Sequence, residues 1–103
     1  MVSKEELNKN IALLKSEYPM TSYWAAVYLG DADDKDAVPA LIAVFSGDDP
    51  DLKVAAAKAL AKLGPDAKAA IPALTELLKD EERWVSAAAE YALEKINSKK
   101  KKK

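Results

Sequence analysis

The densest group of potential metal ligands in this 103-residue chain is a run of aspartates between two predicted helices. The segment Asp31-x-Asp33-Asp34-x-Asp36 has the carboxylate spacing that opens a calcium-binding loop. Such a loop needs a glycine at its sixth position and a bidentate glutamate at its twelfth, where this chain has Asp36 and Ile42. We therefore expect no metal site here, and we interpret the segment as a solvated loop in which Asp36 is the N-cap of the following helix.

Other common catalytic and cofactor-binding chemistry lacks the side chains that it needs. The chain has no histidine and no cysteine, which excludes disulfides, imidazole-dependent triads, and zinc, haem or copper sites built on these ligands. Its three glycines are too far apart to form a phosphate-binding loop. A carboxylate-only enzyme would need an acid in an apolar site that shifts its pKa, and the sequence offers no such site. We therefore expect a protein that is not an enzyme and that uses no cofactor.

Charge divides the chain into an acidic body and a basic tail. The formal net charge is −1, but residues 99–103 are five consecutive lysines, so that the remaining residues carry −6. An acidic body argues against nucleic-acid binding, which requires a basic surface. We expect residues 1–98 to form a single domain and residues 99–103 to be a solvated basic tail, although such runs can also contact nucleic acid or anionic lipid.

The sequence predicts neither a membrane span nor a secretory signal. No apolar run approaches the ~20 residues that a transmembrane helix needs. The first residues, Met-Val-Ser-Lys-Glu-Glu, contain no apolar segment of the kind that directs secretion. A soluble cytoplasmic protein without a membrane partner is the default expectation.

The chain repeats itself at an offset of 33 residues. Residues 37–41 recur as 70–74, and residues 52–60 recur as 85–93. Each unit is predicted to form two helices, because its apolar residues follow the i, i+3, i+4 spacing of a helical face. Short loops then make consecutive helices antiparallel, so the fold class is all-α, an α-solenoid of about three antiparallel helix pairs. The predicted helices span residues 4–18, 19–30, 36–46, 50–63, 67–79 and 82–98.

The repeated blocks Ala-(Val/Ile)-Pro-Ala-Leu and Ala-Ala-Ala-x-Ala-Leu resemble HEAT-like repeats, specifically the short alanine-rich kind of phycobilisome-lyase-type proteins. The resemblance runs from about residue 20 to residue 96. It implies a right-handed stack in which the second helix of each pair lines a concave face available to a partner. Near-ideal repeats, short length and the lack of histidine and cysteine are typical of an engineered scaffold or binder. Natural archaeal or bacterial HEAT-like proteins also have these features.

Three positions on each second helix are expected to point away from the core. Counted backward from the leucine that recurs in each unit (Leu29, Leu60 and Leu93), they lie two, six and nine residues earlier. Their offsets of three and four residues place them on one helical face. Members of the resembled family are usually polar at such positions, whereas this chain has mainly aromatic and apolar residues. The predicted stripe consists of Met20, Tyr23, Val27, Asp51, Val54, Lys58, Trp84, Ala87 and Tyr91.

An outward stripe of this composition predicts protein binding. Tyrosine, tryptophan and methionine are enriched in protein interfaces, and a contiguous exposed apolar patch generally marks a binding surface. The sequence therefore predicts a module that recognises a folded protein partner through this stripe. Two alternatives stay open: a homodimer formed through the same stripe, and a helix register shifted by one residue that would turn these side chains into the core.

Aromatic residues near the first repeat are interpreted differently. Trp24 and Tyr28 replace alanine at positions that point inward in the other units, so we expect them to fill the core at the open end of the stack. Tyr18 is expected to help close the same end. The three glycines are expected at helix ends: Gly30, Gly47 and Gly64.

Overall fold

The computed structural model describes residues 3–98, and its regular secondary structure is entirely helical within that range. None of its helices there is long and apolar enough to cross a membrane. This arrangement confirms the all-α fold and the small solenoid of helix pairs; residues 99–103, the predicted tail, lie outside the described residues. The helices are α1 (Lys4–Leu13), α2 (Pro19–Ala32), α3 (Val38–Ala43), α4 (Pro50–Leu63), α5 (Ile71–Leu77) and α6 (Arg83–Asn97), with short 3-10 helices at Lys35–Ala37, Val44–Ser46 and Gly64–Ala70.

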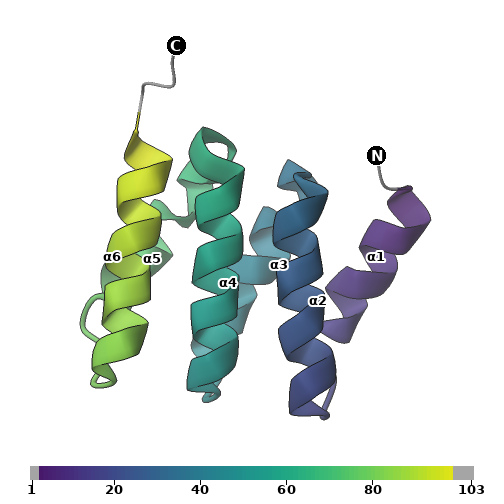
Figure 1. Cartoon of the computed structure of the whole chain (residues 1–103), viewed down its shortest axis with the longest axis horizontal. Coiled ribbons are helices and arrows are strands. Elements are labelled where there is room, and N and C mark those ends of the chain that lie inside the picture. Colours follow the sequence, from purple (N-terminus) through teal and green to yellow (C-terminus); the bar gives the residue numbers. More distant parts are fainter. Residues whose placement is uncertain (1–2, 99–103) are drawn as a thin grey trace.

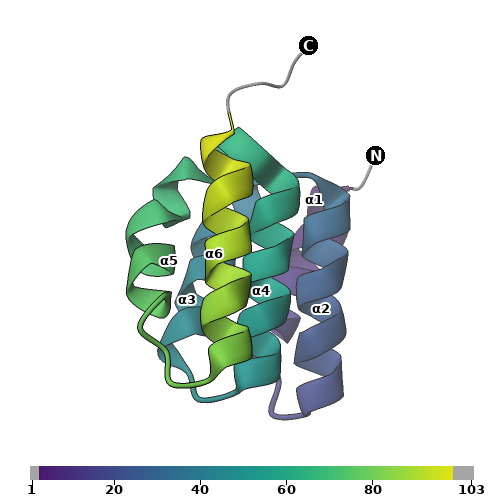
Figure 2. The same cartoon turned by 60° about the vertical axis from the view of Figure 1, so that its left-hand side comes forward.

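The helices form two layers. Figure 1 shows α2, α4 and α6 side by side and parallel to one another, with α3 and α5 behind them and α1 beside α2. In Figure 2 the second layer, with α3 and α5, is seen to one side of the first. The Cα atoms extend over 35 × 31 × 17 Å, so the molecule is a slab. The layer of α2, α4 and α6 forms one of its two broad faces, which we call the α2–α4–α6 face. We call these three helices the inner helices.

Neighbouring helices of this layer approach closely because they meet through alanine and glycine. Ala55 and Ala59 of α4 are buried on the side toward α2, and Ala88 and Ala92 of α6 are buried at the corresponding positions toward α4. A Cβ atom added to Gly30 would lie 2.8 Å from the Cα of Ala59. Gly30 therefore lies inside α2, where it permits this contact, and its predicted position at a helix end is wrong. We call the contact between α2 and α4 and the contact between α4 and α6 the alanine seams.

The first helix ends earlier than its apolar pattern predicts. α1 stops at Leu13, and the next turns close with i→i+3 hydrogen bonds, from the Ser16 N–H to the Leu13 carbonyl for example. Tyr18 is extended (φ −93°, ψ 112°) because the following Pro19 disfavours the helical conformation of the residue before it. Pro19 then begins α2, where its missing N–H is tolerated.

The helical segment that follows the aspartate loop is capped by a different residue from the one predicted. Asp34, not Asp36, accepts the hydrogen bond: its carboxylate receives the Asp36 N–H at 2.9 Å. The helical segment begins at Lys35, one residue before the predicted start, so the cap moves to the residue that precedes it. Gly47 and Gly64 do lie at helix ends, and Gly64 has the positive φ (60°) that favours glycine.

Candidate protein-binding face

All nine residues of the predicted stripe lie on α2, α4 and α6, and none of them is buried. Met20, Trp84 and Tyr91 expose 65%, 47% and 48% of their surface. Tyr23, Val27 and Val54 are half-buried, whereas Asp51, Lys58 and Ala87 are exposed. The register that would turn the stripe into the core does not occur. Its role in binding stays a prediction.

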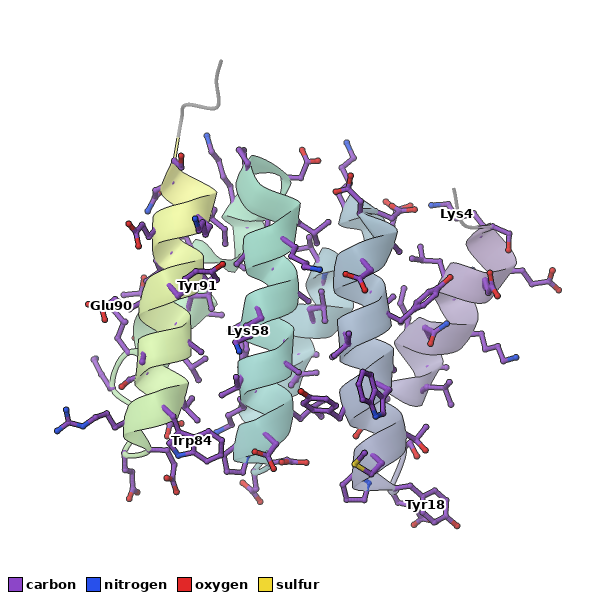
Figure 3. All side chains as sticks on the ribbon, in the orientation of Figure 1. Lys4, Tyr18, Lys58, Trp84, Glu90 and Tyr91 are labelled. Carbon is purple, nitrogen blue, oxygen red and sulfur yellow. The ribbon has the colours of Figure 1, made fainter. Side chains whose placement is uncertain are left out.

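Two adjoining grooves run between the helices of this face. The larger, about 660 Å³, lies between α4 and α6 and is walled on the α6 side by Trp84, Ala87 and Tyr91. The smaller, about 180 Å³, lies between α2 and α4 beside Tyr23 and Val27. Figure 3 shows Lys58 on α4 next to the α6 side chains of the larger groove. Both grooves share three residues of α4: Val54, Lys58 and Lys62.

The two α6 aromatic rings are held by neighbouring polar groups. The Nε1–H of Trp84 donates a hydrogen bond of 2.8 Å to the carboxylate of Glu82. The ammonium of Lys95 lies 5.5 Å from the ring centroid of Tyr91, within the range of a cation–π contact. These contacts favour one orientation of each ring before any partner binds. The larger groove therefore has aromatic walls of defined geometry.

The charges of the face change sign along the helices. Asp51 lies in the first turn of α4, and Lys58 and Lys62 lie further along the same helix. Lys62 pairs with Asp31 of α2 across the smaller groove. Among residues 3–98, neither Asp51 nor Lys58 takes part in an ion pair. An acidic and a basic side chain thus stand exposed on the same helix, each without a charged partner in that range.

The structure contradicts the predicted roles of two N-terminal aromatics. Trp24 and Tyr18 are exposed by 57% and 67%, although both were expected to fill or close the end of the core. Position 24 corresponds to the alanines that face the preceding inner helix on α4 and α6, and α2 has no preceding inner helix among residues 3–98. Tyr28 is half-buried against the core, and its hydroxyl lies 3.4 Å from the carboxylate of Glu6, to which it donates.

Trp24 is a candidate binding residue that the sequence prediction missed. Its ring packs edge-to-face on Tyr23, with centroids 5.3 Å apart and planes at 89°. It lies four residues after Met20 and three before Val27, so the same helical spacing that defined the stripe could have included it. The comparison with alanine in the other repeats concealed this, because those alanines are covered by the preceding helix of the layer, and α2 has no such helix in the described part of the chain.

The aspartate loop is occupied by structural contacts. Lys4 of α1 pairs with Asp34, at 3.3 Å, and with Asp36. The Asp36 N–H, helped by Lys4, lowers the pKa of the Asp34 carboxyl below its ordinary value. Contact with Asp36 raises the pKa of Lys4. Residues 3–98 contain no cluster of three or more side chains placed to hold a metal ion. These carboxylates therefore serve to cap a helix and to join α1 to the rest of the fold.

Comparison with known families adds one finding. A family model described as HEAT repeats matches residues 7–94. This range spans most of the chain and contains all nine stripe residues as well as Trp24. A comparison with curated proteins finds no match.

Proposed function

Because the chain belongs to the HEAT repeat family, we propose that it is a non-enzymatic protein-binding module whose α2–α4–α6 face docks on a folded protein. HEAT repeats are commonly protein-interaction modules and are generally non-catalytic. The observation that carries the proposal is the exposure of Trp84, Tyr91 and Met20 on one broad face. Placement among the short alanine-rich repeats, like an engineered origin, rests on the sequence alone and stays a prediction.

Recognition by this face is recognition by a rigid surface. Its side chains stand on three packed helices, so docking orders little backbone, and less of the contact energy is lost to conformational entropy. Trp84 and Tyr91 are already oriented by Glu82 and Lys95, and Tyr23 by Trp24. Large aromatic side chains with few rotatable bonds supply much contact area at small entropic cost. The grooves beside them accept side chains of the partner.

Photo-crosslinking from a single position tests this proposal. A photoreactive benzoylphenylalanine replaces Ala87, which is exposed between Trp84 and Tyr91, and the protein is irradiated in the cells from which its gene comes. A matched variant carries the same group at Ala69, which is exposed in the connection between α4 and α5. We expect a protein adduct of discrete mass from Ala87 and none from Ala69. Adducts at neither position, or equally at both, would contradict a binding role for the face.

A further inference from the structure

The nine stripe residues form a grid of three rows on three parallel helices. Each helix contributes one residue to a middle row, one residue three positions earlier and one four positions later. On α6, Figure 3 shows Trp84 near the N-terminal end and Tyr91 further along. The rows are Met20, Asp51 and Trp84; Tyr23, Val54 and Ala87; and Val27, Lys58 and Tyr91.

This grid is complementary to itself. A rotation of 180° about an axis that lies along the middle row, in the plane of the face, superposes the first row of one molecule on the third row of another. Each inner helix then crosses its own counterpart in the antiparallel direction. Asp51 meets Lys58 of the second copy, and Trp84 meets Tyr91 of the second copy. Met20 likewise meets Val27. Opposite charges therefore face each other across the contact, and apolar surface faces apolar surface.

We propose that the partner of the α2–α4–α6 face is a second copy of this chain, docked antiparallel about that two-fold axis. This inference rests on the proposed function, because it identifies the partner of the same face. In one molecule, Asp51 and Lys58 are separated by seven residues along α4, a rise of roughly 10 Å, which is too far for an ion pair. In the antiparallel dimer each of them has a partner of opposite charge, and the arrangement occurs twice by symmetry.

The shape of the molecule is suited to this contact. The slab is 17 Å thick, and its broad side measures 35 by 31 Å between Cα atoms. A side of this size can cover the ~800 Å² per partner that a standard specific interface buries. An isologous contact requires a surface that is complementary to itself, as the three rows of this grid are.

Other modes of self-association are disfavoured by charge. A two-fold axis parallel to α4 would place Asp51 opposite Asp51 and Lys58 opposite Lys58, which is repulsive.

Continuation of the stack beyond α6 is disfavoured as well. Glu90 and Glu94 are exposed on α6 at the positions where α4 has buried Ala57 and Ala61. Two carboxylates in place of alanines prevent the close approach that an alanine seam needs.

Charge reversal with mixing tests the antiparallel dimer. The full chain, D51K, K58E and an equimolar mixture of the two variants are compared by sedimentation equilibrium between about 10 and 500 μM, a range in which weak interfaces dissociate. We expect the wild type to dimerise and each variant alone to dissociate at least about tenfold more readily, because both of its ion pairs become repulsive. In the mixture, each position 51 faces a position 58 of opposite charge, so we expect the dimer to return.

Matched controls remove general effects of charge. D66K and K68E reverse exposed charges in the connection between α4 and α5, and we expect both to dimerise like the wild type. A wild type that stays monomeric at the highest concentration, or a mixture that associates no better than its components, would overturn the dimer. In that case an adduct from Ala87 to another protein still supports the binding face. The absence of any such adduct removes the proposed function itself.

Discussion

The sides of the inner helices differ from their exposed face in the size of their residues. Toward α2 and α6, α4 carries the buried alanines Ala59 and Ala61, and Gly30 of α2 packs closely against Ala59. On the α2–α4–α6 face the same layer carries Trp84 and Tyr91, which are about half exposed. The residues at the seams are therefore small, whereas those of the exposed face include large aromatic side chains. We infer that close helix packing stabilises the fold, whereas the aromatic residues are free to serve recognition.

Enlarging a residue inside a seam is expected to have the largest effect. Gly30→Leu places a side chain where even a Cβ would lie 2.8 Å from the Ala59 backbone, so α2 and α4 must separate. Such overpacking costs ~1–3 kcal/mol, which outweighs the gain of up to ~1 kcal/mol from replacing glycine within a helix. Urea unfolding followed by circular dichroism measures the loss of stability.

Introducing leucine on the exposed face as well shows whether close packing at the seam, and not a general sensitivity to a larger side chain, causes the loss of stability. Ala87→Leu adds a side chain between Trp84 and Tyr91, where the groove is unfilled, and we expect it to change the free energy of unfolding by no more than ~0.5 kcal/mol. Equal destabilisation by Gly30→Leu and Ala87→Leu would mean that the seams are no more closely packed than the face, and the contrast between them would fail.

The repeat pattern explains why the seams and the layers could be predicted from sequence. An offset of 33 residues and regular apolar spacing define helix pairs, and alanine at equivalent positions indicates closely packed second helices. The environment of Trp24 could not be found in this way. Its equivalents Ala55 and Ala88 are buried by the preceding inner helix, and α2 has none among the described residues. Repetition predicts the interior of an array and fails at its first unit.

Two other differences have non-local or conformational causes. Gly30 looks like a helix terminator in isolation, because its role depends on Ala59, which lies one repeat away in the chain. The helical pattern continues to Tyr18, but α1 ends at Leu13 in i→i+3 turns, and Pro19 holds Tyr18 in the extended conformation. The exposure of the stripe follows from helical spacing, whereas the proposed pairing of its rows becomes apparent only when two copies of the face are placed together.

Truncating an aromatic residue of the face should separate recognition from stability. For Trp84→Ala and Tyr91→Ala we expect a loss of ~1–3 kcal/mol in association, as is typical of interface hot spots, and a change of at most ~0.5 kcal/mol in unfolding. Sedimentation equilibrium measures dimerisation, and the yield of the Ala87 adduct measures binding of another protein. Tyr18→Ala is the control, because Tyr18 is more exposed than either residue but lies outside the stripe. If the Trp84 or Tyr91 variant unfolds, these side chains stabilise the fold and their role in recognition is not supported.

The attachment of α1 differs from the seams because charged groups contribute to it. Lys4 pairs with Asp34 and Asp36, whereas the buried residues named at the seams are alanine and glycine, which do not titrate, and the Lys62–Asp31 pair lies at the exposed edge of one seam. The pKa of Asp34 is lowered below 3.8. The charged Asp34 therefore stabilises the fold above that pH, and this stabilisation is lost as the pH falls through the lowered pKa. The pKa of Lys4 is raised above 10.5, so the charged Lys4 stabilises the fold below that pH, and this stabilisation is lost as the pH rises through the raised pKa.

Asp34→Asn is expected to have the smallest effect, and that effect should depend on pH. Asparagine retains an oxygen that can accept the Asp36 N–H but loses the charge opposite Lys4. We expect a slightly lower melting temperature than that of the wild type near neutral pH. The two should converge as the pH falls through the lowered pKa of Asp34, because the carboxyl then becomes protonated in the folded chain as well. Thermal unfolding of both proteins from about pH 2 to pH 7 measures this. A constant difference across that range would show that the carboxylate acts through its shape and not through its charge, and α1 would then be held, like the seams, by contacts that do not titrate.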